Sequence, residues 1–305
     1  MSTTISKAGE KINIEAIFAK NVPLASYSSF ACGGNADLFF APADVLQLQS
    51  AVAWARSHTV ELTILAGGTN VLISDKGVEG LVISTNRLNH NHVRGTLFCC
   101  EAGLSMDSAI NNAIEHSLSG LEPLGGLPGS VGGAVWGNAA VHELAIAQLI
   151  EWVDYLDEQA LMQRLWAVDG GFGYKHSPFK GTKAVIVEIA FRLIANSNTS
   201  QARLSKEASR QKRIDAGQFE YPSAGCMFKN PSASLSAGAL IDQAQMKGAS
   251  IGGAYVSSSH ANFIINAQHT ATSSDIFALS ELVKERVQQH SGITLDREIV
   301  LIGRW

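Results

Sequence analysis

The sequence predicts an α+β protein with two domains. Its 305 residues exceed the size of a single ordinary core. Candidate strands and helices both occur, but they do not alternate as regular βαβ units, which argues against a doubly wound parallel sheet. The polar stretch "ANSNTS" near residues 195–200 precedes a charged segment with a different character, and it marks the expected domain boundary.

The first domain is expected to hold one early helix and then short strands. Residues 44–58 place apolar side chains on one helical face, and Asp44 can cap the start. The segments "LTILAGGTN", "GLVIST" and "LFCCEAG" follow as strand candidates. Cys99 and Cys100 lie in the last of them, so we interpret both as small buried residues of a strand.

Further elements alternate with loops toward the C-terminus. Residues 105–120 predict a helix that Ser105 caps and Gly120 ends. The segments "LIEWVDYLD" and "AVIVEIAFRLI" predict strands on either side of the loop "GGFGYKHSPFKG". Beyond the boundary, 203–214, "LSAGALIDQAQMKG" and "SSDIFALSELVKERVQQH" predict helices, whereas "HANFIIN" and "LDREIVLIG" predict strands.

Composition excludes several classes of protein. The net charge of −4 and the pI of about 6.1 give no basic field for nucleic acid. The start, "MSTTISKAGEKINIEAIFAK", lacks the apolar core of a signal peptide, and no run approaches the roughly 18 apolar residues of a membrane span. The four cysteines have no zinc-site spacing, so we expect no metal and a reduced, cytoplasmic protein.

Two glycine-rich loops can bind an anion through their backbone. They are "AGGTN" (66–70) and "GGLPGSVGGA" (125–134). Neither is a P-loop or a G-x-G-x-x-G fingerprint. Glycine nevertheless lets backbone N–H groups approach a diphosphate closely, and successive N–H groups form an anion-binding concavity. Ordinary tight turns are the alternative interpretation.

Three residues are candidates for proton or charge chemistry. Cys226 lies in "SAGCMFKNP" between small residues, with Lys229 three positions on. Glu298 shares a strand face with Val300 if "LDREIVLIG" is extended. Lys175 lies in the loop "GYKHSPF". A packed thiol, an exposed acid and a solvated loop cation are the respective alternatives, and the residues alone leave them open.

The ordered set of motifs resembles a known family. The motifs are "SSFACGGNADLFF", "LAGGTNVLISDKGVEGLVI", "GLEPLGGLPGSVGGAVWGNA", "GYKHSPF", "YPSAGCMFKNP", "AGALIDQAQMKGASIGGAYVSSSHANFIIN" and "LDREIVLIG". From about residue 20 onward they are similar to the UDP-N-acetylenolpyruvoylglucosamine reductases. The absence of a long insertion with an extra substrate tyrosine resembles the shorter form of that family.

The resemblance implies a fold and a set of cofactors. It implies a split FAD-binding region of the p-cresol methylhydroxylase type over 20–195, with lobes of about 20–85 and 86–195. A substrate-binding α+β domain would cover 200–305. FAD would be non-covalent, NADPH the co-substrate and the enolpyruvyl UDP-sugar the substrate of a peptidoglycan precursor step. The protein is expected to be a monomer that binds no nucleic acid and does not insert into a membrane.

The resemblance also assigns roles to individual positions. Cys226 falls on the proton donor, Glu298 on the catalytic glutamate and Lys175 on the cationic position. The implied substrate contacts are Tyr174, Asn230, Lys247 and His260. The implied FAD contacts are Gly67, Gly68, Thr69, Asn70, Val71, Leu72, Gly129, Ser130, Gly133, Ala134 and Asn138.

Three departures from the family pattern stand out. The usual Tyr-Arg-x-Ser reads Tyr174-Lys175-His176-Ser177, which keeps the charge but loses the bidentate fork of arginine. The usual Asn-Ala-Gly ends in Ala140, and the usual Gln-Pro is replaced around 217–218. Two alternative functions therefore stay open: another flavin oxidoreductase of the same fold, or a catalytically degenerate nucleotide-binding module.

Overall fold

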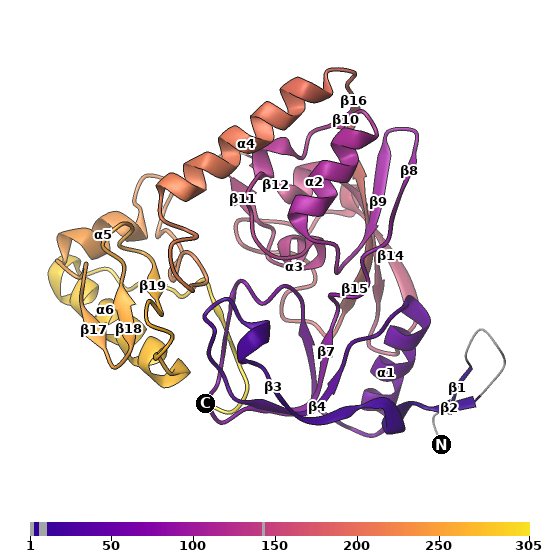
Figure 1. The fold of residues 1–305 in the computed structure, drawn as a ribbon, viewed down its shortest axis with the longest axis horizontal. Helices are drawn as coiled ribbons and strands as arrows, with labels where there is room; N and C mark the ends of the chain where they lie inside the picture. Colours follow the sequence, from indigo (N-terminus) through magenta and orange to yellow (C-terminus); the bar gives the residue numbers. More distant parts are fainter. Residues whose placement is uncertain (1–2, 6–10, 142–143) are drawn as a thin grey trace. The chain divides into compact units, whose positions relative to one another are not determined.

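The computed structural model describes residues 3–5, 11–141 and 144–305. The chain forms two compact units (Figure 1). Unit 1 comprises Met1–Lys20, Leu38–Gly67 and Gly80–Gln211, and unit 2 comprises Asn21–Asp37, Gly68–Glu79 and Lys212–Trp305. Both units mix helices with mainly antiparallel strands, so the predicted α+β class is confirmed. The domain limits of 20–195 and 200–305 stay a prediction.

The largest sheet of unit 1 is five-stranded, in the order β14-β13-β15-β9-β8 (Figure 1). Its neighbours pair antiparallel, with Cys99 of β9 opposite Ala190 of β15. The strands are β8 (Asn91–Arg94), β9 (Leu97–Glu101), β13 (Ile150–Leu156), β14 (Met162–Trp166) and β15 (Val185–Arg192). This sheet contains three of the predicted strand segments.

A second sheet has the order β3-β4-β7-β5, in which β5 and β7 are parallel. Its strands are β3 (Ala19–Pro23), β4 (Asn35–Phe40), β5 (Leu62–Leu65) and β7 (Val78–Ser84). The short pairs are β1 (Thr3–Ile5) with β2 (Lys11–Asn13), β10 (Leu118–Ser119) with β16 (Ile194–Ala195), and β11 (Ala140–Val141) with β12 (Leu144–Ala145).

The α-helices that begin in unit 1 are α1 (Val45–Ser57), α2 (Met106–Glu115), α3 (Val131–Trp136) and α4 (Thr199–Asp215). Helices α1 and α2 start where their capping residues predict, whereas α4 starts before the predicted residue 203 and α3 was not predicted. Asp44 accepts a hydrogen bond from Gln47 N at 2.9 Å, and Ser105 accepts one from Ser108 N at 3.0 Å. Helix α2 ends earlier than the predicted Gly120, because Ser117 adopts a positive φ of 56°.

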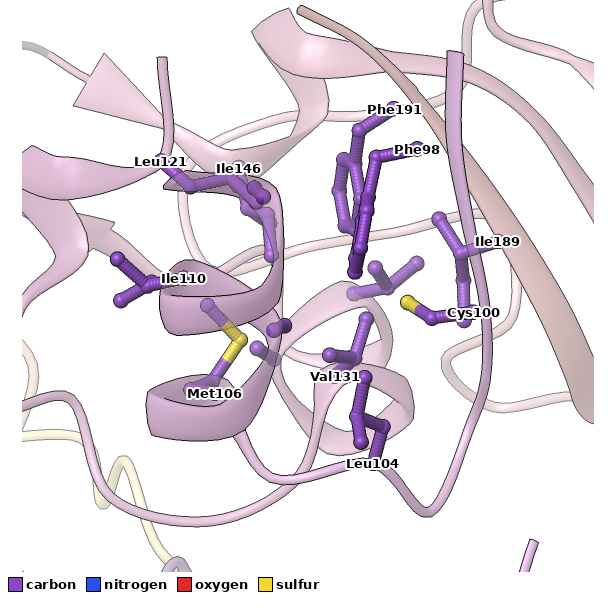
Figure 2. Packing of buried hydrophobic residues seen from close by; sticks show 14 of the residues in the cluster. Phe98, Cys100, Leu104, Met106, Ile110, Leu121, Val131, Ile146, Ile189 and Phe191 are labelled. Carbon is purple, nitrogen blue, oxygen red and sulfur yellow. The ribbon is translucent and has the colours of Figure 1, made fainter. Parts of the chain in front are cut away.

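The main core of unit 1 lies between the five-stranded sheet and helices α2 and α3. Figure 2 shows Phe98 and Phe191 of the sheet facing Met106 of α2 and Val131 of α3. Cys100 points into this core and is fully buried, whereas Cys99 packs on the opposite face. The interpretation of both cysteines as buried strand residues is confirmed. The core fixes the start of α3, which carries the second glycine-rich loop.

Unit 2 combines two helices with small sheets. Helices α5 (Ala237–Gln243) and α6 (Ser273–Ser291) accompany the antiparallel sheet β17 (Ser250–Ile251), β18 (Ala254–Val256) and β19 (Ile264–Ile265). Strand β6 (Val71–Ile73) pairs in parallel with β20 (Val300–Ile302). This last pair joins the segment after the first glycine-rich loop to the segment that holds Glu298.

Three predicted elements of unit 2 are shorter in the structure. The helix "LSAGALIDQAQMKG" ends at Gln243, and Gln245 adopts a positive φ of 56°. The strand "HANFIIN" contributes only β19, and "LDREIVLIG" only β20. Glu298 therefore lies before the strand rather than in it. Searched over the described residues, the chain has no helix that is both long and apolar enough to cross a membrane.

Among the residues that the structure describes, five 3-10 turns complete the elements. They are η1 (Ile14–Ile17), η2 (Ala25–Tyr27), η3 (Glu122–Leu124), η4 (Ile146–Leu149) and η5 (Ala167–Asp169).

Candidate active site

The two glycine-rich loops touch within unit 1. A Cβ atom added to Gly67 would lie 2.6 Å from the Cα atom of Gly129 and 3.0 Å from the backbone N of Ser130. Such distances leave no room for a side chain at this position. Glycine at 67 therefore allows the backbones of both predicted anion-binding loops to meet.

Replacing Gly67 with alanine should push these loops apart. The new Cβ would meet backbone atoms, which cannot rotate away, so we expect destabilisation of more than about 1 kcal/mol and weaker retention of FAD. Thermal unfolding and the ratio of flavin to protein absorbance would measure both effects. Gly137→Ala is the matched control, because its Cβ would lie at an ordinary 3.5 Å from Gly133 O. Equal flavin retention in both variants would contradict the prediction.

The second loop is pinned by its own backbone. Ser130 caps α3 by accepting a hydrogen bond from Gly133 N at 3.3 Å. Val131 N donates to Leu104 O at 2.8 Å, and Met106 N donates to Gly129 O at 3.0 Å. The loop is thus held against the start of α2, and these bonds fix its backbone in one conformation.

Asn138 connects the end of α3 to the loop that contains Lys175. Asn138 adopts a positive φ of 44°, and its Nδ2 donates to Gly173 O at 2.8 Å. Ala140, which replaces the glycine of the family pattern, opens β11 in an extended conformation. This position needs no glycine, so the departure at Ala140 does not disturb the loop.

The loop of Lys175 is a tight turn with several anchors. Gly173 and His176 pair with each other, and Lys175 between them has a φ of 52°. The buried Ser177 donates from Oγ to Trp136 O at 2.7 Å. Lys180 Nζ donates to Lys175 O at 3.2 Å and lies 5.0 Å from the centre of the Trp136 ring. A positive φ at a non-glycine residue is uncommon and is often found at functional positions.

Cys226 and Glu298 are brought together in unit 2. Cys226 pairs with Phe263 in an antiparallel bridge. Glu298 N donates to Met227 O at 2.8 Å, so the backbone of Glu298 lies one residue away from Cys226. Both side chains are partly exposed. The two predicted catalytic residues of unit 2 are therefore neighbours, although 71 positions separate Met227 from Glu298 in the sequence (298 − 227).

The end of the first glycine-rich loop lies beside Glu298. Asn70 Nδ2 donates to Glu298 O at 3.3 Å, and Val300 N donates to Asn70 O at 3.0 Å. Val71 and Leu72 continue as β6 opposite Val300 and Leu301. Asn70 thus positions the backbone of Glu298, a role that the sequence did not indicate.

The residues predicted to bind substrate have contacts of their own. Asn230 accepts a hydrogen bond from Ala237 N at 3.0 Å, at the start of α5. Lys247 pairs with Asp242 at 3.3 Å. Tyr174, in unit 1, is 63% exposed, as befits a residue on a loop surface.

His260 lies on an aromatic ring next to the Cys226 segment. Its imidazole stacks on Phe263 with ring centres 4.1 Å apart, and its Nδ1 accepts from Asn262 N at 3.2 Å. Burial lowers the pKa of His260 from its ordinary value, and the charge of Lys247 acts in the same direction. The imidazole is consequently neutral near pH 7 and available for hydrogen bonding.

Two residues near Cys226 were missed by the sequence analysis. Arg213 Nη1 donates to Gln218 Oε1 at 3.0 Å, and Gln218 Nε2 lies 3.7 Å from the position of a Cβ on Gly225. The available signal was helical spacing. On α4, the residues that face inward are Ala202, Ser205, Lys206, Ser209 and Arg213. A charged side chain in line with these inward-facing residues is turned away from solvent, and this spacing could have singled out Arg213.

The residues of this chain fit FAD in two respects. No acidic side chain occurs in 66–72 or 125–138, so nothing in the glycine-rich loops repels a diphosphate. Ser29 N donates to Gly68 O at 3.0 Å, while Ser29 Oγ is buried with no hydrogen-bond partner in the described part of the chain. A buried hydroxyl of this kind calls for a polar partner. Over the same residues, no group of three metal-binding side chains occurs.

Comparison with known proteins agrees with both parts of the chain. Residues 36–165 match the family model of an FAD binding domain. Residues 217–302 match the model of the C-terminal domain of UDP-N-acetylenolpyruvoylglucosamine reductase. Arg213 lies just outside the second match, whereas Gln218, Cys226 and Glu298 lie within it.

Relatives extend the likeness to almost the whole chain. The UDP-N-acetylenolpyruvoylglucosamine reductase of Heliobacterium modesticaldum is 35% identical over 92% of this chain and 89% of its own length. That of Synechococcus sp. is 36% identical over 92% and 90%. The crystal structure of the Thermus caldophilus enzyme matches 92% of this chain and 97% of its own, with 28% identity and a TM-score of 0.76. The chain therefore belongs to the UDP-N-acetylenolpyruvoylglucosamine reductase family.

Proposed function

We propose that this protein uses NADPH and FAD to reduce the enolpyruvyl ether of UDP-N-acetylglucosamine to UDP-N-acetylmuramate in peptidoglycan precursor synthesis. Relatives that share about a third of their residues over 92% of the chain support this activity most strongly. The pairing of the Cys226 segment with Glu298 supports it independently. We further propose that the protein works in the cytoplasm as a monomer.

The reaction needs a proton and a place for negative charge. FAD, when bound, supplies the redox chemistry by accepting a hydride from NADPH and passing it to the terminal vinyl carbon. The neighbouring carbon must then gain a proton, and the C=C bond becomes a single bond. We assign that proton to the thiol of Cys226, which becomes a thiolate as it is lost.

Negative charge develops toward the substrate carboxylate before the proton arrives. We assign its stabilisation to the ammonium of Lys175 and to the carboxyl of Glu298 in its protonated form. The anchors on the Lys175 turn would hold the ammonium in one region, because Asn138 holds Gly173 before it and Ser177 is held after it. Preorganised groups stabilise a transition state without reorganisation.

The glycine-rich loops would hold the cofactor. In unit 1, Gly67 lies against the backbone of Gly129 and Ser130, and Gly133 follows in the same loop. The N–H groups of Val131, Gly132 and Gly133 already donate within the protein, so they hold the loop in shape rather than bind the anion. In unit 2, Thr69 follows Gly68, whose backbone meets Ser29. We propose that the remaining neutral donors of these loops bind the diphosphate of FAD.

FAD should be bound without a covalent link. In unit 1, the two cysteines near the cofactor region, Cys99 and Cys100, are buried within the sheet, and no histidine occurs within 66–72 or 125–138. Acid precipitation of the purified holoenzyme should therefore release the yellow chromophore into the supernatant. Colour that stays with the precipitate would contradict this prediction.

A visible absorption spectrum tests the function itself. The holoenzyme should absorb near the flavin bands, lose that absorption with NADPH under anaerobic conditions, and recover it when the enolpyruvyl UDP-sugar is added. A colourless protein that binds no FAD would favour the degenerate nucleotide-binding module. Flavin that NADPH does not reduce would instead favour another oxidoreductase of the same fold.

A further inference from the structure

The guanidinium of Arg213, in unit 2, bonds to a glutamine that lies beside the segment of Cys226. In the last turn of α4, Lys212, Ile214 and Asp215 are exposed, and Arg213 is the half-buried residue among them. Its burial is costly for a charged group unless that group is paired and hydrogen-bonded. The hydrogen-bond partners and neighbouring charges of Arg213 therefore indicate its role.

Gln218 clamps Arg213 at two points. Gln218 N donates to Arg213 O at 3.0 Å, and Arg213 Nη1 donates to Gln218 Oε1 at 3.0 Å. Between them, Gly217 has a φ of 75°, which turns the chain back on the end of the helix. The result is a closed ring of two hydrogen bonds that holds the guanidinium in place.

The same glutamine amide faces the residue before Cys226. Gln218 Nε2 lies 3.7 Å from the position of a Cβ on Gly225, whose φ of 70° shapes the turn into Cys226. Burial lowers the pKa of Arg213 from its ordinary value, while the negative charge of an ionised Cys226 acts in the opposite direction. The bond of Arg213 to Gln218, and the position of Gln218 beside Gly225, place the guanidinium near the segment of Cys226.

Other ionisable groups around Cys226 are arranged differently. Glu298 lies across Met227 and would oppose a negative thiolate if ionised. His260 is neutral at pH 7, because burial lowers its pKa. Arg297, on the same segment as Glu298, pairs with Glu281 of α6. Lys229 lies three residues after the cysteine, where its N donates to Asp296 O.

We propose that Arg213, held by Gln218, is a positioning residue that stabilises the thiolate form of Cys226. This inference rests on the proposed role of Cys226 as proton donor. A donor thiol becomes a thiolate in the step in which it protonates carbon, and an adjacent fixed cation favours that product. The same cation makes the free thiol ionise at lower pH, so Arg213 would both speed proton transfer at neutral pH and bring the alkaline loss of activity nearer.

The decisive test measures the ionisation of the Cys226 thiol independently of catalysis. The holoenzyme would be treated with iodoacetamide from pH 6 to 10, and alkylation of the Cys226 peptide measured by mass spectrometry. In Arg213→Met, the midpoint of reactivity should move upward by about one pH unit or more. Gln218→Leu should move it less in the same direction, and Arg213→Lys should restore most of the wild-type midpoint.

A second measurement follows catalysis. Anaerobic reoxidation of reduced enzyme by the enolpyruvyl UDP-sugar should be slower in Arg213→Met at neutral pH, and its alkaline limb should move upward with the alkylation midpoint. In Cys226→Ser the alkaline limb should be absent with or without Arg213. Arg210→Met is the matched control, because Arg210 is an exposed residue of the same helix that pairs with Glu207. Its midpoint should equal that of the wild type.

The outcomes distinguish the inference from the proposed function. An unchanged alkylation midpoint in both Arg213→Met and Gln218→Leu, with bound FAD retained, overturns the role of Arg213. A midpoint that moves while the alkaline limb of the half-reaction does not would support the electrostatic contact and overturn Cys226 as proton donor.

Discussion

Cys226→Ala is expected to slow the sugar half-reaction by roughly 10²–10⁴-fold, whereas Cys226→Ser should remain active. Alanine has no proton to give, and serine keeps one. Cys226 is partly exposed and adjoins Glu298 across Met227, so either replacement fits without disturbing the core. Stopped-flow reoxidation of the reduced enzyme by the enolpyruvyl UDP-sugar would measure the step.

The pH dependence of the same reaction gives a second signature. A thiol ordinarily ionises near pH 8.5, whereas a serine hydroxyl stays protonated throughout the working range. The wild-type rate should therefore fall at alkaline pH, and Cys226→Ser should lose that fall. The wild type should also be more sensitive to peroxide than the serine variant. A near-normal rate in Cys226→Ala would return Cys226 to the interpretation of a packed small residue.

Lys175→Ala should produce the other large effect, a loss on the order of 10²-fold in the sugar half-reaction. Flavin reduction by NADPH should change little, because the proposed ammonium acts on charge that develops only in the enolpyruvyl substrate. The anchors at Ser177 and Lys180 remain in the variant, so the turn keeps its backbone. Single-turnover rates of the two half-reactions would be compared.

Two further variants make the result on Lys175 specific. Lys175→Arg should retain activity if the site accepts the arginine of the family pattern. Lys183→Ala removes an exposed lysine of the same unit and should leave both half-reactions unchanged. Equal losses in both half-reactions of Lys175→Ala would point to impaired flavin binding instead.

Local signals predicted the elements that depend on nearby residues. Asp44 and Ser105 cap α1 and α2 as expected, since capping is decided within one turn. The capping box of Thr272 and Asp275 likewise starts α6. The ordered motifs also predicted the family and gave Cys226 and Glu298 roles in one reaction, although not the backbone bond that makes them neighbours.

Long-range pairing decided what the sequence could not predict. "HANFIIN" forms little strand because Asn262 instead bonds to Phe228, as donor to O at 2.8 Å and as acceptor from N at 3.0 Å. Glu298 precedes β20 because the partner strand β6 begins only at Val71. The role of Arg213 was hidden because seven of the 17 residues of α4 are charged, and only packing shows which of these charges faces inward.

The parallel pair of β6 and β20 has a consequence for biosynthesis. Val71 meets Val300 across 229 positions (300 − 71), and the side chains of Arg304 and Asp37 form an ion pair over a similar separation. A nascent chain therefore carries Asn70 and β6 away from the ribosome long before their partners are translated. Unit 2 therefore cannot complete its folding while the chain is still being translated. Contacts of such high sequence separation also form slowly. The strand that orders Glu298 should be the last to become protected from hydrogen exchange during refolding.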